Sequence, residues 1–387
     1  MTEKRLGDII DIKHGYAFDG EHIVSDDNGI VLVTPGNFKI GGGFKEEKCK
    51  FFTGEIPEDY ILNNGDYIVT MTDLSKDIDT LGYSAKIPDN PKRMYLHNQR
   101  IGLLNFKDND VCKDYIYYVM QTNDYQRSIA NTSSGATVHH TSPTKIYEYT
   151  FKLPKYSIQK KIADLLGSYD SLIENNQKQI NLLEEAAQRL YKEWFVDFRF
   201  PGYEDTKFID GIPDRWRKEL VGSIIDNIPR RKQIKATDYL DVGAIPIVDQ
   251  SKNFIAGYTN DIEAIINIEK PVIVFGDHTR VLKYLQFPFA KGADGTQLIV
   301  SKETNMPQSL FYCSLIAVDL SNYHYARHFK YLKAETILVP TKDVADRFDV
   351  LAVPMFSMIQ NLRDISNKLT QARDRLLPKL MSGEIEV

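Results

Sequence analysis

Three short clusters combine basic, aromatic and small polar side chains in a way that suits contact with nucleic acid. They are segment 133–141 with Lys145, the run 230–232, and segment 323–331, in which basic and aromatic residues alternate. A fourth segment, 278–280, follows a β-rich run. Basic side chains neutralise phosphates, and Arg reads guanine in the major groove. The candidate DNA-contacting residues are Ser134, Gly135, Thr137, His139, His140, Lys145, Arg230, Arg231, Lys232, His278, Arg280, His324, Arg327, His328 and Lys330. For each of them, a solvated surface side chain is the alternative interpretation.

The motifs of catalysis are missing from the sequence. There is no Gly-x-x-x-x-Gly-Lys-Ser/Thr phosphate loop and no Asn/Asp-Pro-Pro-Tyr tetrapeptide. The glycines at 41–43 lack the strand–turn–helix context of a dinucleotide loop and indicate a turn. His139 and His140 have no partner at zinc spacing. We therefore expect no catalytic residue, no metal site and no bound cofactor. An enzyme with unrecognised motifs remains the alternative.

Composition indicates a globular intracellular protein rather than an autonomous DNA-binding domain. The 387 residues carry a net charge of −5, whereas isolated DNA binders usually have a basic surplus. Either the positive charge lies on one face or partner subunits supply it. No apolar run approaches the ~18 residues of a membrane span, and the N-terminus lacks a signal-peptide core. Three scattered cysteines suit the reducing cytoplasm.

A repeated segment must hold these clusters in place. Residues in the middle of the chain recur near its C-terminus at a constant offset of 186, as Ile173 recurs at Ile359 and Leu183 at Leu369. In both copies apolar residues step by four and three, the heptad pattern of a coiled coil. The predicted seam residues are Ile162, Leu166, Ile173, Asn176, Ile180, Leu183, Leu190, Trp194, Met355, Ile359, Leu362, Leu369 and Leu376. Two helices with matching seams in one chain most simply pair with each other; two unrelated surface helices are the alternative.

Both predicted helices also carry an apolar stripe wider than a two-helix seam needs. Leu165 and Leu172 in the first helix correspond to Leu351 and Met358 in the second. The extra positions either pack against the chain's own domains or form a docking face for another subunit. Gly167-Ser168 and Val353-Pro354 also lie in register, and we expect each helix to kink or restart there.

The remaining sequence forms two related globular segments that repeat more loosely. Ile68-Val69 resembles Ile273-Val274 at an offset of 205, and each segment ends in a Pro-marked run. We expect short strands at 30–34, 67–71, 100–104 and 272–275, and helices at about 114–130 and 308–322. The fold class is mixed α/β or α+β, with a pseudo-twofold repeat. The predicted domains are 1–155, the helix 156–200, a second globular domain 201–341 and the helix 342–387.

The helices and their borders resemble the conserved regions of one family. The matching runs are Gln159–Leu166, Leu190–Phe198 and Arg375–Ile385, with weaker matches at the domain openings Leu6–Gly15 and Ile212–Leu220. They resemble the specificity subunits of type I restriction-modification systems. The resemblance covers the whole chain in its order of parts, but it is specific only in the helices.

The resemblance implies two target-recognition domains, each contacting half of an asymmetric bipartite site in double-stranded DNA. Two long antiparallel helices, paired as an intramolecular coiled coil, would set the gap between the halves. Two methyltransferase subunits would dock on the helices, and restriction-translocase subunits would join them. S-adenosylmethionine, ATP and Mg would belong to those partners, in the cytoplasm of a prokaryote. A protein-only coiled-coil adaptor is a further alternative.

Overall fold

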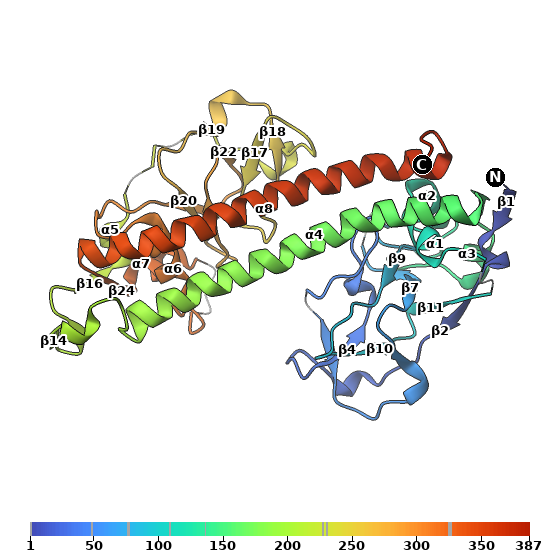
Figure 1. Cartoon of the computed structure of the whole chain (residues 1–387), viewed down its shortest axis with the longest axis horizontal. Coiled ribbons are helices and arrows are strands. Elements are labelled where there is room, and N and C mark those ends of the chain that lie inside the picture. The colour runs from blue at the N-terminus through green and yellow to red at the C-terminus, as the bar shows by residue number, and fades with distance from the viewer. Residues whose placement is uncertain are drawn as a thin grey trace. The chain divides into compact units, whose positions relative to one another are not determined.

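The computed structural model describes residues 2–47, 49–75, 78–107, 110–135, 137–226, 228–229, 231–323 and 327–387. The chain forms two compact units. Unit 1 comprises Met1–Ile173 together with Lys368–Val387, and unit 2 comprises Glu174–Asn367. Unit 1 therefore contains both chain termini and the last turns of the C-terminal helix (Figure 1).

Unit 1 contains two main sheets. A four-stranded antiparallel sheet has the order β2-β11-β7-β9, and a five-stranded sheet has the order β3-β5-β4-β10-β6, in which β4 and β10 are parallel. The strand bounds are β2 Ile10–His14, β3 Ile23–Val24, β4 Ile30–Val33, β5 Lys50–Phe52, β6 Ile61–Leu62, β7 Tyr67–Thr70, β9 Ser84–Lys86, β10 Met94–His97 and β11 Ile101–Phe106. β7 is buried along its whole length, as its continuous apolar run predicts.

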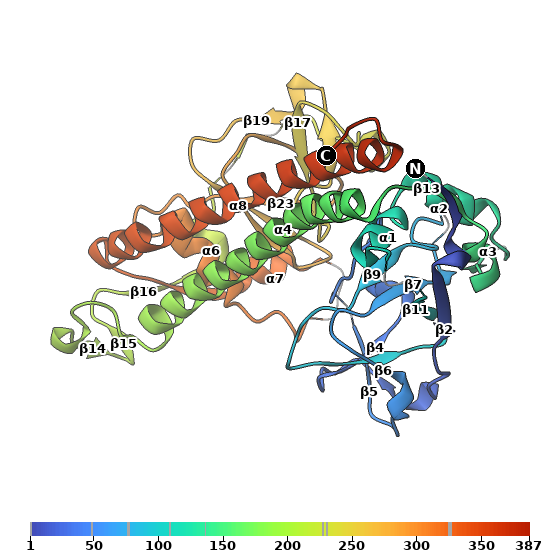
Figure 2. The ribbon, with the colours of Figure 1, turned by 45° about the vertical axis from the view of Figure 1, so that its right-hand side comes forward.

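Helices α1 (Lys113–Val119) and α2 (Asn123–Asn131) pack on the four-stranded sheet of unit 1 (Figure 2). The sequence predicts one helix here, but the chain breaks at Thr122, whose hydroxyl caps α2 by accepting from the Tyr125 amide. A further short helix is α3 (Pro143–Tyr147). Strand β1 (Thr2–Arg5) pairs antiparallel with β13 (Thr150–Leu153), which immediately precedes the long helix.

Unit 2 repeats this plan in a shorter form. Its sheets have the orders β18-β17-β22-β19 and β21-β20-β23, with the fully buried β20 in the centre of the second. The strand bounds are β17 Ile245–Val248, β18 Gly257–Thr259, β19 Ile265–Ile266, β20 Val272–Gly276, β21 Leu282–Leu285, β22 Phe289–Lys291 and β23 Thr296–Ile299. β16 (Arg217–Leu220) pairs antiparallel with β24 (Thr336–Val339), as β1 pairs with β13 in unit 1.

The helices of unit 2 besides the long ones are short. They are α5 (Val221–Ile224), α6 (Gln308–Ile316) and α7 (Phe329–Ala334), and a hairpin of β14 (Phe208–Ile209) and β15 (Ile212–Pro213) precedes β16. The helix expected at 308–322 thus ends at Ile316. Asp319 then forms a turn by accepting a hydrogen bond from the Ser321 amide at 2.8 Å.

Two long helices run through both units. α4 spans Tyr156–Tyr191 and continues as a π-helical turn over Lys192–Val196, and α8 spans Lys342–Ser382. The expected restarts at Gly167-Ser168 and Val353-Pro354 are wrong, because each helix is continuous through them. Pro354 and Val350 are both exposed, so water can satisfy the Val350 carbonyl that loses its helical partner.

Within each unit, α4 and α8 pair in antiparallel directions. In unit 1 the Arg373 guanidinium donates to Asp170 at 2.6 Å, and in unit 2 that of Arg363 donates to Glu184 at 2.7 Å. The seam residue Asn176 is buried and donates to the Ser366 hydroxyl at 3.1 Å. The other predicted seam residues are buried or half-buried. The mixed α/β class with two long helices, predicted from the sequence, is confirmed.

Candidate nucleic-acid interface

In unit 2 the turn between β20 and β21 is tightly closed and presents two of the predicted contact residues, His278 and Arg280. The Arg280 amide donates to the Gly276 carbonyl at 2.8 Å. Arg280 has φ of 60°, a left-handed conformation that is uncommon for a residue with a side chain. His278 and Thr279 are exposed at the tip. The strand pair β20–β21 therefore carries a tightly hydrogen-bonded turn, residues 277–281, called the β20–β21 turn below.

A second segment of unit 2 packs against the β20–β21 turn from a position about fifty residues later in the chain. His328 is only 5% exposed, and its amide donates to the Asp277 carbonyl at 2.8 Å. Its ring Nδ1 lies 2.9 Å from that same carbonyl oxygen, and its Nε2 lies 3.1 Å from the carbonyl oxygen of Tyr323. The Asp277 carboxylate accepts from the Phe329 amide at 2.7 Å. The ring predicted to contact DNA thus lies inside the unit.

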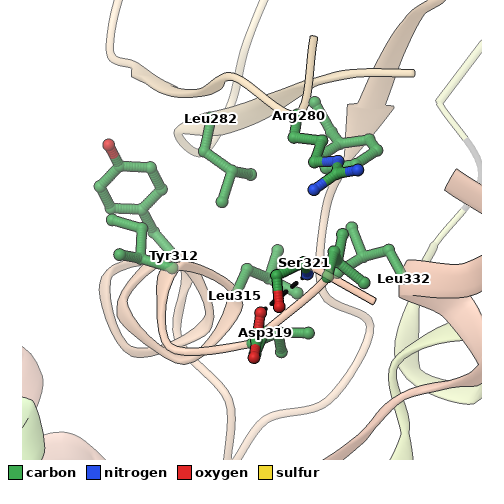
Figure 3. A pocket seen from close by; sticks show the side chains of 11 residues that line it. Arg280, Leu282, Tyr312, Leu315, Asp319, Ser321 and Leu332 are labelled. Atoms are coloured by element: carbon green, nitrogen blue, oxygen red, sulfur yellow. Dashed lines mark hydrogen bonds between the residues drawn. The ribbon is translucent and has the colours of Figure 1, made fainter. Parts of the chain in front are cut away.

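The Arg280 side chain adds a further link between the two segments. Its Nη2 donates to the Tyr323 carbonyl at 2.6 Å. The guanidinium points into a cavity of about 440 Å³ lined by apolar residues such as Leu282 and Leu315 (Figure 3). At its rim, hydrogen bonds from Ser321 and the nearby Arg280 charge hold the pKa of Asp319 below its usual range. Arg280 is therefore engaged within unit 2.

Gln250 connects the β20–β21 turn to another loop of unit 2. Its Oε1 accepts from the His278 amide at 3.0 Å, its Nε2 donates to the Asp294 carbonyl at 2.7 Å, and its own carbonyl accepts from the Thr279 hydroxyl at 2.6 Å. A Cβ atom on Gly295 would lie 2.7 Å from the Gln250 amide, so the packing is close. One glutamine thus holds both loops at this edge of the sheets.

The basic run at 230–232 reaches this edge through its neighbour Gln233, which donates to the Asp294 carboxylate at 3.2 Å. Arg231 is exposed. The Lys232 ammonium pairs with Asp261 at 2.6 Å, and this hydrogen bond raises the pKa of Lys232. Arg230 and His324 lie outside the described residues. Three of the predicted clusters therefore converge on one edge of unit 2.

Two predicted basic residues lie on the exposed side of that edge. Arg327 and Lys330 are both exposed, and the Lys330 ammonium lies 4.9 Å above the ring of Tyr331. The rings of Tyr323 and Tyr331 stack with centroids 4.3 Å apart. With His278, these residues give the edge exposed donors that suit phosphate and base contacts.

In unit 1 the corresponding segment closes on the end of the central strand β7. β12 (His139–His140) pairs antiparallel with β8 (Thr72–Asp73), and Ser134 and His140 exchange backbone hydrogen bonds. The Lys145 ammonium donates to the Thr132 carbonyl. Gly135 has φ of 108°, and a Cβ there would lie 1.9 Å from the Val138 carbonyl oxygen. The first predicted cluster is thus one compact loop, with Ser134, Thr137 and His140 exposed.

Asp73 anchors the turn that follows β8. Its side chain accepts from the amides of Ser75, Thr80 and Leu81 at 2.6, 2.6 and 3.0 Å. Burial opposes ionisation of this carboxyl group, but the hydrogen bonds from Ser75 and Thr80 outweigh it and lower its pKa. Asp73, Asp277 and Gln250 are not among the site residues predicted from the sequence. The available signal was an acidic or amide residue shortly after a buried strand.

Among the described residues, no group of three or more His, Cys, Asp or Glu side chains could hold a metal ion. No described helix is long and apolar enough to cross a membrane. The arrangement offers turns, exposed donors and rigid strand ends, which are the elements of a binding surface.

Comparisons with known proteins agree with this type of surface. Residues 1–185 match the model of the type I restriction modification DNA specificity domain. The chain is 28% identical over 309 residues to the type I restriction enzyme MjaIX specificity subunit of Methanocaldococcus jannaschii, covering 72% of this chain and 70% of that protein. It is 34% identical over 101 residues to the EcoR124I/EcoR124II specificity subunit of Escherichia coli, covering 26% of this chain and 24% of that one.

A solved structure shares the fold over nearly the whole chain. The type I restriction-modification S subunit from M. genitalium superposes with a TM-score of 0.58 at 16% identity, covering 98% of this chain and 96% of that one. The chain, with its two repeated α/β units, therefore shares the fold of that subunit. The first 185 residues thus match the DNA specificity domain of type I restriction-modification systems, and 72% of the chain is similar to a specificity subunit of such a system.

Proposed function

We propose that this chain is the non-catalytic subunit that gives a type I restriction-modification complex its DNA sequence specificity. The observation that carries the proposal is the repeated closure in both units. In each, the segment before the long helix folds back onto the end of the buried central strand, β7 or β20, and leaves polar side chains exposed there. Each closure forms one recognition surface for half of a bipartite DNA site.

The proposal assigns residues 1–155 and 201–341 to two target-recognition domains, and 156–200 and 342–387 to the spacer. In unit 1 the exposed contacts are Ser134, Thr137 and His140, with Gly135 shaping their loop. In unit 2 they are His278, Arg327, Lys330 and Arg231. His328 and Arg280 act from within. Because the chain has a net charge of −5, the proposal includes partner subunits that contribute much of the phosphate neutralisation.

The long helices serve as spacer and docking frame in this proposal. On α8, Leu351, Met358 and Ile365 recur every seven residues and are 45%, 50% and 47% exposed. On α4, Leu172 is 50% exposed at the position equivalent to Met358. Such an exposed apolar row marks a protein interface, and two methyltransferase subunits are the proposed occupants. S-adenosylmethionine, ATP and Mg would be bound by the methyltransferase and restriction subunits, in the prokaryotic cytoplasm.

Mapping of modified bases in the host genome tests the function. A two-part methylated motif should be present in the wild-type strain and absent from a strain in which this gene is deleted. Replacing residues 1–155 with the equivalent domain of a relative should change one half of that motif and leave the other half and the gap intact. The proposal would be contradicted if the deletion strain kept every methylated motif, or if the domain exchange changed both halves of the motif.

Changing the helices by whole turns tests the spacer. Equal insertions of seven residues in α4 and α8 keep the heptad seam in register. They should alter the number of base pairs between the half-sites without altering either half. A gap that stays constant in an active complex would show that the helices do not set it.

A further inference from the structure

The turn that joins β10 to β11 lies at one edge of the four-stranded sheet of unit 1. In that sheet β11 lies between β2 and β7 (Figure 1). Ile101 at the start of β11 pairs with Thr70, the last residue of β7. Gly102 pairs with His14, the last residue of β2. The turn, residues 98–100, is therefore in the middle of this edge, with a strand end on either side.

The same edge carries the loop to which we assign DNA contacts in unit 1. The Met71 amide, directly after β7, donates to the Arg100 carbonyl at 3.0 Å, and the Met71 carbonyl accepts from the Thr141 amide at 3.0 Å. Arg100 and Thr141 thus flank one residue, at about two strand spacings or ~10 Å from each other. Base pairs follow one another at about 3.4 Å along DNA. Side chains of the two segments can therefore reach base pairs of one short half-site.

Hydrogen bonds and close packing fix the backbone of this turn. The Arg100 amide donates to Asn98 Oδ1 at 3.2 Å, and the Ile101 amide donates to the Asn98 carbonyl at 3.0 Å. The buried His97 supports the turn from within, with its Nε2 2.9 Å from the Ile101 carbonyl oxygen. Gly15 packs so closely that a Cβ atom there would overlap the Asn98 carbonyl oxygen. None of these contacts uses the Arg100 side chain.

The Arg100 side chain itself is exposed. Within the part of the chain that the structure describes, no hydrogen bond, ion pair or ring contact engages its guanidinium, and only its backbone is bonded. Other arginines of unit 1 are paired, as Arg93 is with Asp27 at 2.9 Å and Arg373 with Asp170 at 2.6 Å. Arg100 therefore presents five N–H donors from a fixed backbone, so that only side-chain freedom is lost when it binds a ligand.

The chemistry and position of Arg100 favour a base over a phosphate. The planar guanidinium matches two adjacent acceptors, and guanine offers O6 and N7 in the major groove. That groove is about 12 Å wide. Strands β2 and β7 lie about 10 Å apart on either side of β11, so the turn between them fits into the groove while their ends face its walls. A residue in the middle of the edge is thus placed towards the bases.

We propose that Arg100 is a specificity-determining residue of unit 1, whose guanidinium reads a guanine in the half-site that unit 1 recognises. The inference rests on the proposed function, because it concerns the target-recognition domain 1–155. It adds that one G·C pair of that half-site is required because of Arg100. In unit 2 the residue opposite the end of β20 is Thr296, which is buried and donates to the Ala293 carbonyl at 2.9 Å. The requirement is therefore particular to unit 1.

The test uses the full-length chain in complex with its methyltransferase subunits, acting on unmethylated genomic DNA from a strain that lacks the system. Methylated sites are mapped, and exchange of residues 1–155 identifies the unit 1 half of the motif. Arg100→Ala should accept other bases at one guanine of that half, with discrimination there lower by about 5- to 150-fold. The other half and the gap should stay unchanged. An unchanged motif, or weaker methylation at every site without a change of motif, would overturn the proposal.

Two further variants separate base reading from charge and from folding. Arg100→Lys keeps the charge but not the planar pair of donors, so it should also lose discrimination. A wild-type motif in Arg100→Lys would show that charge alone suffices and would overturn the proposal. The control Arg5→Ala removes an exposed arginine of β1, near the opposite end of β2, and should keep the motif. Thermal unfolding of Arg100→Ala should match that of the wild type, because the side chain has no partner within the described residues.

A modified base tests the contact itself. Replacing the proposed guanine by 7-deazaguanine, which has a C–H group in place of N7, should weaken oligonucleotide binding by the wild-type complex. The same replacement should not weaken binding by the Arg100→Ala complex further. Equal weakening in both complexes would assign N7 to another residue and overturn the proposal. A wild-type complex that methylates without any sequence preference would instead refute the proposed function.

Discussion

Replacement of Asp170 by Asn should destabilise unit 1, although the substitution only exchanges one carboxylate oxygen for an amide group. The Asp170 carboxylate accepts from the Arg373 guanidinium and from the Tyr118 hydroxyl, both at 2.6 Å. It thereby joins α4 to α8 and to α1. The charge and hydrogen bond of Asp170 raise the pKa of Arg373 against the effect of burial, and burial with Asp170 raises that of Tyr118.

The magnitude follows from these two contacts. Hydrogen bonds to a charged group contribute about 1.5–3 kcal/mol each. Asparagine has one acceptor oxygen, so it can replace the carboxylate towards Arg373 or towards Tyr118 but not towards both. The Asp170 side chain is 30% exposed, so water offsets part of the loss. We therefore expect a loss of about 2 kcal/mol in the free energy of unfolding. For a unit of about 190 residues this corresponds to a melting temperature lower by ~4–8 °C.

Thermal unfolding followed by tryptophan fluorescence would report mainly on unit 2, which contains Trp194 and Trp216. Hydrogen exchange resolved by peptide is therefore the appropriate assay, and protection should fall in unit 1 peptides of α1 and the end of α8. The matched control is Asp164→Asn, because the Asp164 side chain is 63% exposed and pairs with Lys160 on its own helix. If Asp170→Asn behaved like this control, the pairing argument for unit 1 would be refuted.

Three further changes test other parts of the structure. Asn176→Leu should raise the melting temperature, because an apolar residue is more stable at this buried seam position. The Ser366 hydroxyl would still donate to the Leu362 carbonyl. A lower melting temperature in calorimetry would contradict the placement of Asn176 in the helix seam. Burial lowers the pKa of Lys283 from 10.5 to about 8 in the folded protein. Between these two pH values the unfolded chain binds more protons than the folded chain, so the free energy of unfolding of unit 2 should rise with pH. Lys283→Met should abolish that slope in denaturant titrations, and an unchanged slope would assign it to another group. Met358→Glu should leave melting unchanged but reduce co-purification of methyltransferase subunits, whereas Asp364→Lys, on an exposed polar position of the same helix, should not.

The sequence predicts most elements of this fold because their signals are local. The run of apolar residues over 272–275 suffices to indicate β20, and the heptad pattern indicates the paired helices. The predicted helix restart at Pro354 is wrong, because a proline is tolerated where the carbonyl four residues earlier, here that of Val350, faces water. The sequence alone does not show whether that carbonyl is exposed. The break between α1 and α2 depends on one capping hydroxyl, that of Thr122, within a run of otherwise helical residues.

The candidate site is less predictable because its contacts join residues far apart in the chain. Arg373 looks like a defect in the heptad seam until its partner Asp170, 203 positions away, is known. His328 looks like a surface base among basic and aromatic residues, although its ring bonds lie towards Asp277, 51 positions away. Whether a side chain points outwards to a ligand or inwards to the backbone is decided by the tertiary fold.

The two units show why the helices keep a constant offset while the globular segments drift. The closures of β1 on β13 and of β16 on β24 use backbone hydrogen bonds, which nearly any side chain permits. The loops at the ends of β7 and β20 can therefore change composition, as Asp73 with its amide donors in unit 1 and His328 with its two carbonyls in unit 2 illustrate. The helix seam, in contrast, depends on side chains packing at fixed heptad positions, and one inserted residue would rotate every later position out of it. The need to keep this pairing therefore accounts for the constant offset of 186 in the helices, and the proposed recognition of two different half-sites accounts for the drift in the globular segments.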